Sequence, residues 1–361
     1  IPDDIVLLLL ARACAAQTQA APGEASIHVY LIEAAGAVAG GLSVSLVLAP
    51  RLDSIQIAAL AAFLNLLTAA GLVLTSAKWR LAAWAVGLAL WLGLVQPILN
   101  PWLVRTSLAR LWRGFDVVAV ENSAYANLAV IRTEGASSLY VNGLPAFSAS
   151  DPAAAEESVH YALLQHPSPE SLLLIGGGAS GSLSEALKHL SLTRIDYTEL
   201  DPAILRIAGR HFPQQWAPVG ASPRVHTHAA DGRLFLKTSP RKYDVIIVNV
   251  SDPQTAQLNR FYTLEFFREA SRRLSPTGVF SFHVTGAENY LSPERAALLR
   301  SLNKTLRLAF LQVMAYPGAT VHFFAANRRL ALVADPAELV RRLKLRGINT
   351  SYVSEHFIPF R

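Results

Sequence analysis

Long apolar stretches without a charged side chain dominate the first hundred residues. They cover residues 34–50, 54–77 and 81–104. The hydrocarbon core of a bilayer is crossed by a helix of about 20 predominantly apolar residues. The pattern therefore predicts a membrane region over residues 1–104. Its three spanning helices are expected at about 29–50, 55–77 and 81–103.

The alternative interpretation is three buried helices of a large globular protein. Two uncharged runs of 24 residues, separated by the tripeptide Lys78-Trp79-Arg80, favour the membrane interpretation. A further apolar piece, residues 5–14, is too short to span and is expected to be the end of a truncated helix. Both termini of the chain are expected to continue in the natural protein.

The pattern changes after residue 104. Residues 105–115 are basic and amphipathic, which is typical of a connector that lies on a membrane surface. Short alternating runs follow over residues 116–152, around the hairpin signal Asn142-Gly143. We expect a small β-hairpin lobe there.

Residues 153–361 alternate between strand and helix patterns. Strands are expected near residues 171–175, 194–199, 224–228, 244–250 and 278–284. Helices are expected at residues 155–165, 181–190, 202–211, 262–274 and 293–308. Two later apolar runs, 309–316 and 320–327, are expected as edge strands. This alternation predicts the α/β class, with a Rossmann-like, methyltransferase-type, parallel doubly wound sheet.

Charge divides the chain in the same way. Few charged residues lie before residue 100, and the later part carries the excess of Lys and Arg that gives the chain a net charge of +6. These basic residues are scattered rather than arranged in stripes with aromatics, so no nucleic-acid partner is predicted. An anionic membrane surface accounts for the excess. The single cysteine, Cys14, excludes an internal disulfide and a cysteine-rich metal site.

The first predicted span contains an acid and closely spaced glycines. Glu33 precedes Gly36 and Gly40, and glycines at four-residue spacing allow a partner helix to approach closely. An acid at this depth usually has a partner. We expect a helix–helix contact there rather than an ion path. The distribution of Lys and Arg around the spans favours a cytoplasmic location for the part after residue 115.

The strongest motif is LLLIGGGASGSLSEAL, residues 172–187. A strand runs into a glycine turn and then a helix, which lets backbone approach a ligand at a helix N-terminus. Glu199 ends the next expected strand, where a carboxylate can accept both hydroxyls of a ribose. Asp231 and Gly232 follow the third strand, within reach of an adenine amino group. The predicted nucleoside-binding residues are Gly176, Gly177, Gly178, Gly181, Glu199, Asp231 and Gly232.

These motifs occur in a familiar order. IGGGASG, YTELDP, ADGRLFL, YDVIIVNVSDP, RFYTLEFF and SPTGVFSF resemble, in order and spacing, the spermidine synthase (polyamine aminopropyltransferase) family. The resemblance covers roughly residues 116–330. YLIEAAGAVAGG in the membrane region resembles the membrane-fused bacterial branch of that family. This resemblance implies the bacterial inner membrane, with the catalytic domain on its cytoplasmic side.

The resemblance also implies a chemistry. Family enzymes bind decarboxylated S-adenosylmethionine and pass its aminopropyl group to an amine. The glycine loop would hold the nucleoside, Glu199 the ribose and Asp231 the adenine. Decarboxylated S-adenosylmethionine or S-adenosylmethionine is therefore the expected co-substrate, and no metal is expected.

The acceptor half departs from the family pattern. In the glycine loop, Ala179 and Ser180 stand where the family has Asp and Gly. The catalytic loop, D-x-x-D-P in the family, begins here with Asn249, and an amide cannot take a proton at neutral pH. His160 replaces a family tyrosine and is a candidate substitute base, or alternatively a packing histidine. The expected catalytic positions are Asp252, Asn249, His160 and Tyr262.

Two hypotheses remain open. The first is a membrane-anchored transferase that uses an S-adenosyl donor, of the aminopropyltransferase type, with an altered acceptor. The second is a catalytically lapsed relative with a structural or binding role in a membrane complex. The retained Glu199, Asp231 and Asp252 favour ligand binding, whereas Ala179 and Asn249 count against polyamine synthesis. The expected partners are the lipid bilayer and either a second copy or a larger membrane complex.

Overall fold

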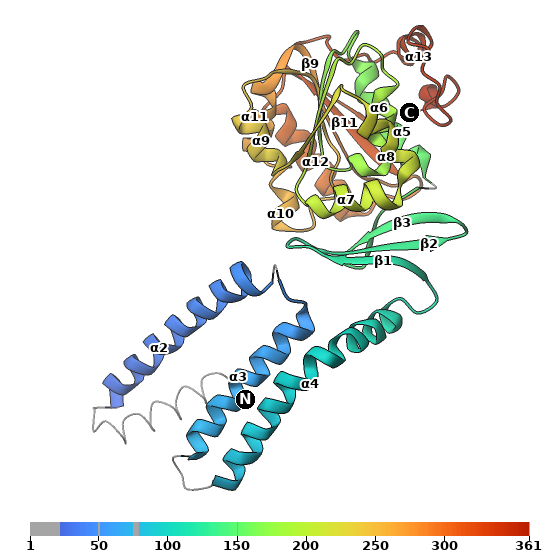
Figure 1. The fold of residues 1–361 in the computed structure, drawn as a ribbon. Helices are drawn as coiled ribbons and strands as arrows, with labels where there is room; N and C mark the ends of the chain where they lie inside the picture. Colours follow the sequence, from blue (N-terminus) through green and yellow to red (C-terminus); the bar gives the residue numbers. More distant parts are fainter. Residues whose placement is uncertain (1–21, 50, 75–78, 150, 361) are drawn as a thin grey trace. The chain divides into compact units, whose positions relative to one another are not determined.

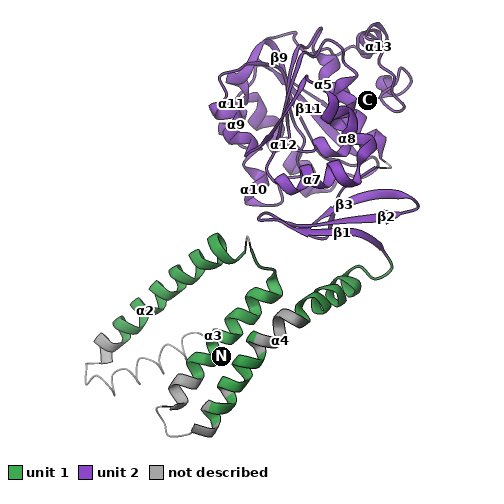
Figure 2. Ribbon diagram, in the orientation of Figure 1, with its two compact units in different colours: residues 1–114 green, residues 115–361 purple. Residues whose placement is uncertain are grey.

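The computed structural model describes residues 22–49, 51–74, 79–149 and 151–360, and the chain divides into two compact units (Figure 2). Unit 1 is residues 1–114 and unit 2 is residues 115–361. The described residues of unit 1 form helices, and unit 2 contains the strands of the described chain.

The described residues of unit 1 form three long helices. Helix α2 (Pro22–Ser43) continues into the π-helical turn η1 (Val44–Leu48), and α3 (Ser54–Leu74) packs along α4 (Trp79–Leu111) (Figure 1). Asn100 on α4 donates a hydrogen bond of 2.6 Å to Asp53 at the start of α3. Within the described residues, one helical stretch, Ser26–Leu48, is long and apolar enough to cross a membrane, while Ser54–Ala69 is shorter.

The predicted end of the third apolar helix is wrong. Helix α4 continues through Pro97 and Pro101 to Leu111 without a break. The predicted basic connector therefore forms mostly the last turns of α4, with Arg110 in the final turn. A basic residue at that end of a helix interacts favourably with the helix dipole.

Unit 2 opens with a four-stranded antiparallel sheet in the order β1-β2-β3-β4. Its strands are β1 (Asp116–Asn122), β2 (Asn127–Thr133), β3 (Ala136–Val141) and β4 (Leu144–Ser148). Asn142 and Gly143 join β3 to β4 with φ of 53° and 79°, the left-handed pair that a two-residue hairpin turn requires. The buried face of this β lobe packs on α7, through Leu128, Val130 and Leu139 against Ala203 and Ile207.

The larger sheet has seven strands in the order β10-β11-β9-β8-β5-β6-β7. The strands are β5 (Ser171–Ile175), β6 (Arg194–Glu199), β7 (Val225–Ala229), β8 (Tyr243–Val248), β9 (Leu274–Thr285), β10 (Gln312–Tyr316) and β11 (Thr320–Ala326). Strands β5 to β9 pair in parallel. Strands β10 and β11 are antiparallel, and β11 pairs with β9.

Helices cover both faces of this sheet (Figure 1). They are α5 (Pro152–Gln165), α6 (Ser182–Leu187), α7 (Pro202–His211), α8 (Pro213–Ala221), α9 (Gly232–Thr238), α10 (Ala256–Asn259), α11 (Leu264–Arg273), α12 (Pro293–Arg307) and α13 (Pro336–Leu345), with short 3-10 turns η2 (Gly178–Ser180) and η3 (Ile358–Phe360). Alternate residues of β5 enter two separate cores: Leu172 and Leu174 face α5, α6 and α13, whereas Leu173 and Ile175 face α9, α11 and α12. This alternation explains why the central strands are apolar throughout.

The fold is Rossmann-like and of the methyltransferase type, as predicted, but the sheet is mixed rather than parallel. The five predicted parallel strands and the helix that begins after Ser292 are confirmed within a few residues. Of the two predicted edge strands, β10 lies at the edge and β11 lies inside the sheet.

Candidate functional site

The glycine turn after β5 brings two loops into close contact. Gly176 and Gly177 have φ of 72° and 66°. A Cβ atom on Gly177 would lie 2.4 Å from Cγ of Asn249, so a side chain at this position is excluded. The glycines were predicted to let the backbone approach a ligand. The geometry shows that they also let the glycine turn approach the loop that follows β8. Of the remaining loop glycines, Gly178 is the first residue of the 3-10 turn η2, and Gly181 is the N-cap of α6.

Glu199 lies at the carboxyl end of β6, as predicted, with its side chain 9% exposed. Its carboxylate accepts hydrogen bonds from the Tyr197 hydroxyl (2.8 Å) and the Asp201 amide (3.3 Å). Burial raises the pKa of Glu199 above its ordinary value, and these hydrogen bonds oppose the rise. Any further hydrogen-bond donor that reaches the ionised carboxylate of Glu199 would stabilise it strongly.

Next to Glu199, the Thr198 hydroxyl is buried and has no hydrogen-bond partner among the described residues. Buried polar atoms are nearly always paired, so an unpaired one beside a cavity is suited to a polar ligand. Gly232 packs against it, because a Cβ atom there would lie 2.9 Å from Thr198 Oγ1 and 2.4 Å from Ile175 Cγ2.

Asp231 follows β7 closely, at the position predicted from the sequence. It is the N-cap of α9, and its carboxylate accepts hydrogen bonds from the amides of Arg233 (2.9 Å) and Leu234 (3.1 Å) and from the Arg260 guanidinium. Burial raises the pKa of Asp231, but the bonds from Arg260 and the backbone outweigh it and leave the pKa below its usual value. Gly232 and Arg260 line the cavity described next, so Asp231 supports its wall.

A cavity of about 420 Å³ lies at the carboxyl ends of the central strands and is called here the nucleoside cavity. This volume is within the usual range for small-molecule sites, and the position is where doubly wound sheets bind ligands. The residues that line it on the sheet side include Ile175, Gly176, Thr198, Glu199, Asp201, Gly232, Val250 and Ser251. The β lobe contributes Tyr125, Ala126, Val141, Asn142, Leu144, Pro145 and Ala146.

One hydrogen bond attaches the β lobe to this cavity. The Ser123 hydroxyl, between β1 and β2, donates a bond of 2.5 Å to Asp201. Asp201 also caps α7 through the Ala203 amide (2.9 Å). Asp201 is not among the predicted site residues, although the Asp-Pro pair is a sequence signal for a helix start.

The loop of residues 249–254, here the catalytic loop, is held through both backbone and side-chain groups. The Asn249 amide donates to the Ile175 carbonyl (2.9 Å), and the Tyr262 hydroxyl donates to the Ser251 carbonyl (3.0 Å). The Asn249 side chain donates to the Ser182 hydroxyl (3.1 Å). Tyr262 is 5% exposed, and burial followed by the nearby Asp252 charge raises the pKa of its hydroxyl. Tyr262 therefore positions the loop as a neutral donor.

Neutral hydroxyl groups surround the position that Ala179 and Ser180 occupy. Ser182 contacts the hydroxyls of Ser158 (2.7 Å) and Ser180 (3.0 Å), and Ala179 is buried beside them. Together with the amide of Asn249, this cluster carries no charge. The substitutions at the glycine loop and at the catalytic loop thus meet in one uncharged polar cluster.

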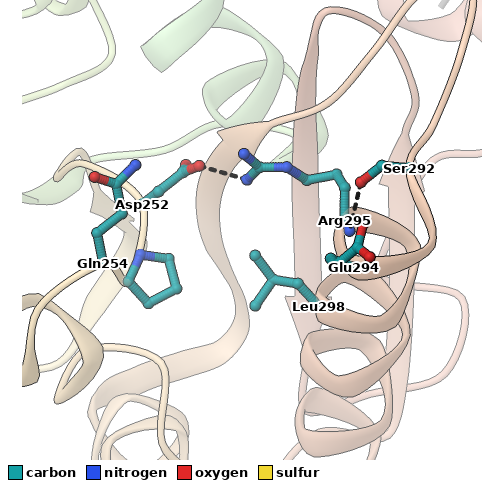
Figure 3. A pocket seen from close by; sticks show the side chains of 7 residues that line it. Asp252, Gln254, Ser292, Glu294, Arg295 and Leu298 are labelled. Carbon is teal, nitrogen blue, oxygen red and sulfur yellow. Dashed lines mark hydrogen bonds and ion pairs between the residues drawn. The ribbon is translucent and has the colours of Figure 1, made fainter.

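Asp252 faces a second cavity, of about 280 Å³, called here the acceptor-side cavity (Figure 3). Its carboxylate accepts a hydrogen bond from the Thr285 amide (2.9 Å) and forms an ion pair with Arg295 (2.6 Å). Gln254 lines both cavities, so the catalytic loop lies between them. Arg295 was not predicted, because its partner is 43 residues away in the chain.

His160 is fully buried and lines neither cavity. Arg346 donates to Nδ1 of His189 (3.2 Å), so His189 donates from Nε2 to Nδ1 of His160 (2.9 Å). His160 then donates from Nε2 to Glu185 (3.0 Å). Both ring nitrogens are thereby occupied, which matches the packing alternative for His160 and not a base at the catalytic loop.

No group of three or more His, Cys, Asp or Glu side chains with the geometry of a metal site occurs in the described parts of the chain. His228, on β7, contacts the buried Asp196 (2.9 Å), which also pairs with Arg194.

The protein has a Rossmann-like α/β fold with a cavity at the carboxyl edge of its sheet, which is where folds of this class bind ligands. Residues 152–332 match the family model of the spermine/spermidine synthase domain. The chain belongs to the spermine/spermidine synthase family.

Similar proteins agree with this assignment. The polyamine aminopropyltransferase of Pyrobaculum calidifontis is 30% identical over 206 residues, which cover 55% of this chain and 70% of that protein. The polyamine aminopropyltransferase of Leptospira biflexa is 36% identical over 135 residues, which cover 37% of this chain and 46% of that protein. The chain therefore spans less than half of the length of the second relative. A solved spermidine synthase in complex with the transition-state analogue AdoDATO shares the fold, with a TM-score of 0.57 and 22% identity over 68% of this chain and 84% of that one.

Proposed function

We propose that unit 2 binds an S-adenosyl-type nucleoside, decarboxylated S-adenosylmethionine or a close relative, in the nucleoside cavity. The observation that carries this proposal is the buried Glu199 beside the unpaired Thr198 hydroxyl, at the carboxyl edge of the sheet. Ribose hydroxyls donate to a carboxylate, and charge-assisted hydrogen bonds are about twice as strong as neutral ones. Gly176 and Gly232 line the same wall.

The reaction that this site supports best is aminopropyl transfer. The lone pair of a neutral nucleophile attacks the carbon next to the sulfonium, the carbon–sulfur bond breaks, and a neutral thioether leaves. If the nucleophile is an amine, its nitrogen must also lose a proton. Asn249 cannot accept that proton, and the charge of Asp252 is neutralised by Arg295. The proposed acceptor is therefore not a standard polyamine substrate.

A second function has a specific observation in its favour. The uncharged cluster around Asn249 and Ser182, together with the Asp252–Arg295 ion pair, leaves the catalytic loop without a free base. In this alternative, the protein binds a nucleoside but transfers nothing, and has a binding or structural role in a membrane complex. Turnover separates the two functions, whereas nucleoside binding is common to both.

We also propose that unit 1 anchors the protein in a bilayer, with unit 2 on the cytoplasmic side. The stretch Ser26–Leu48 is 23 residues long, and its apolar side chains are exposed. Ile32 is 74% exposed and Leu46 is 68% exposed, which is unfavourable in water. Flotation of the full chain with liposomes tests the anchor, and substitution of Ile32 and Leu46 by Lys should weaken it.

Calorimetry on the full chain in detergent tests the nucleoside proposal. S-adenosylmethionine, its decarboxylated form and 5′-methylthioadenosine are titrated separately. We expect at least one to bind at a 1:1 ratio, and binding of none would refute the proposal. Binding without product formation, when putrescine, spermidine and other amines are supplied, would select the non-catalytic alternative.

A further inference from the structure

Arg295 occupies an unusual position for a site that descends from polyamine chemistry. It is the third residue of α12, and its side chain extends across the acceptor-side cavity to Asp252 (Figure 3). The distance from Arg295 Nη1 to Asp252 Oδ2 is 2.6 Å. Asp252 is 8% exposed and the Arg295 side chain is 29% exposed, so the cation points into the cavity while it neutralises the acid.

The ion pair changes what the catalytic loop offers to a ligand. Both oxygens of Asp252 are engaged, Oδ1 by the Thr285 amide and Oδ2 by Arg295. Asn249 is uncharged, so the loop presents no free anion. The remaining charged group of the cavity wall is Glu294, which is exposed in the first turn of α12.

We propose that Arg295 is a specificity-determining residue that takes the place of a substrate ammonium at Asp252 and excludes diamines and polyamines from the acceptor-side cavity. The acceptor class is then a molecule without a cation at the end that meets Asp252. This inference rests on the proposed function, because it takes the catalytic loop to separate the nucleoside from the acceptor.

The physical basis is competition between a tethered and a free cation. Arg295 is part of the chain, so it forms the ion pair without the loss of translational freedom that a free diamine would incur. A diamine that entered would also place its ammonium near the displaced guanidinium, well within the screening length of about 8 Å at physiological salt. Arg is always charged, so no pH between 5 and 9 removes this repulsion.

The experiment measures putrescine binding by calorimetry on the full chain saturated with 5′-methylthioadenosine. The background is Asn249→Asp, which restores the first acid of the loop. Arg295→Gln in this background should tighten putrescine binding by about 10- to 100-fold, the effect of one freed charge-assisted hydrogen bond. Arg295→Lys keeps the cation and should give no gain. Arg300→Gln removes an equal charge from an exposed position on the same helix and should also give no gain.

Three outcomes would overturn the inference. They are unchanged putrescine binding in Arg295→Gln when methylthioadenosine binding is intact, an equal gain in Arg300→Gln, and a gain in Arg295→Lys. If Arg295→Gln does not fold, the unsubstituted protein decides: millimolar putrescine should not raise its unfolding temperature in the presence of methylthioadenosine, and a rise would overturn the inference. If the unsubstituted protein does not bind methylthioadenosine, that result counts against the proposed function and not against the inference about Arg295.

Discussion

Glu199→Gln is the substitution that best tests the nucleoside cavity, because it should move stability and binding in opposite directions. The glutamine can keep both contacts of the apo site: its oxygen accepts from the Asp201 amide, and its amide group donates to the Tyr197 hydroxyl, which can reverse its role. The substitution thus removes the charge and keeps the shape. A ribose would lose the charge-assisted part of its two hydrogen bonds.

The expected magnitude follows from the chemistry of those bonds. Hydrogen bonds to charged groups are worth about 1.5–3 kcal/mol, and a neutral amide retains part of this. We expect a loss of about 2–3 kcal/mol, which corresponds to methylthioadenosine binding that is about 30- to 150-fold weaker. Calorimetry at pH 8 measures it, with Glu170→Gln as the control, because Glu170 is exposed just before β5, at the opposite edge of the sheet.

Glu199→Gln should weaken nucleoside binding but should leave the stability of the protein unchanged or raise it. Because burial raises the pKa of Glu199, its contribution to stability is fully present below the pKa of the unfolded chain and is lost as the pH rises through the folded pKa. At pH 8 the buried anion is unfavourable, so Glu199→Gln should unfold at an equal or higher temperature. In the unsubstituted protein, nucleoside affinity should fall as the pH drops through the raised pKa of Glu199, and the variant should lack this dependence. Equal affinities of the two proteins at pH 8 would refute the assignment of Glu199 to the ribose.

Three further predictions concern the fold around the site. Gly177→Ala should lower the free energy of unfolding by about 2–4 kcal/mol, because the added methyl group is overpacked and the φ is unfavourable. At Gly143, where an added methyl group meets open space, the same substitution should lower it by about 1 kcal/mol. Denaturant titrations that gave equal losses for the two variants would contradict the close contact between Gly177 and Asn249. Ser123→Ala removes the bond to Asp201 and should weaken methylthioadenosine binding several-fold in calorimetry, and an unchanged affinity would mean that the lobe closes the cavity without it. Burial lowers the pKa of three histidines, His166, His189 and His283. The unfolded chain therefore takes up protons first as the pH falls from 7 to 5, so the urea midpoint should drop over that range, and a constant midpoint would contradict their burial as neutral groups.

The strands of the central sheet were predicted well, because the patterns that indicate them lie in short continuous stretches of the sequence. Strand β5 and the glycine turn after it lie in one continuous motif, and Ser292 followed by Pro293 marks the start of α12 without reference to any distant residue. The directions of β10 and β11 cannot be predicted from the residues of these two strands alone. They depend on pairing with β9, and a parallel and an antiparallel strand can have the same apolar sequence pattern.

The site was predictable to the same extent. Glu199 and Asp231 both lie where the strand-end rule placed them, whereas the pairing of Asp231 with Arg260 depends on a side chain 29 residues later. The ion pair of Asp252 with Arg295 depends on how α12 packs against the sheet. The sequence left two interpretations of His160 open, a substitute base or a packing histidine, and its burial between His189 and Glu185 involves residues 25 and 29 positions away.

The anchoring of the catalytic loop has a consequence for how this site can be altered. Backbone groups fix the loop: the Asn249 amide bonds to β5, and the Tyr262 hydroxyl bonds to the Ser251 carbonyl. The side chain at position 249 adds one hydrogen bond, to the Ser182 hydroxyl, to this backbone framework. A scaffold of this kind can exchange an acid for an amide in a single step and keep its fold, so the same backbone is open to redesign towards new acceptors.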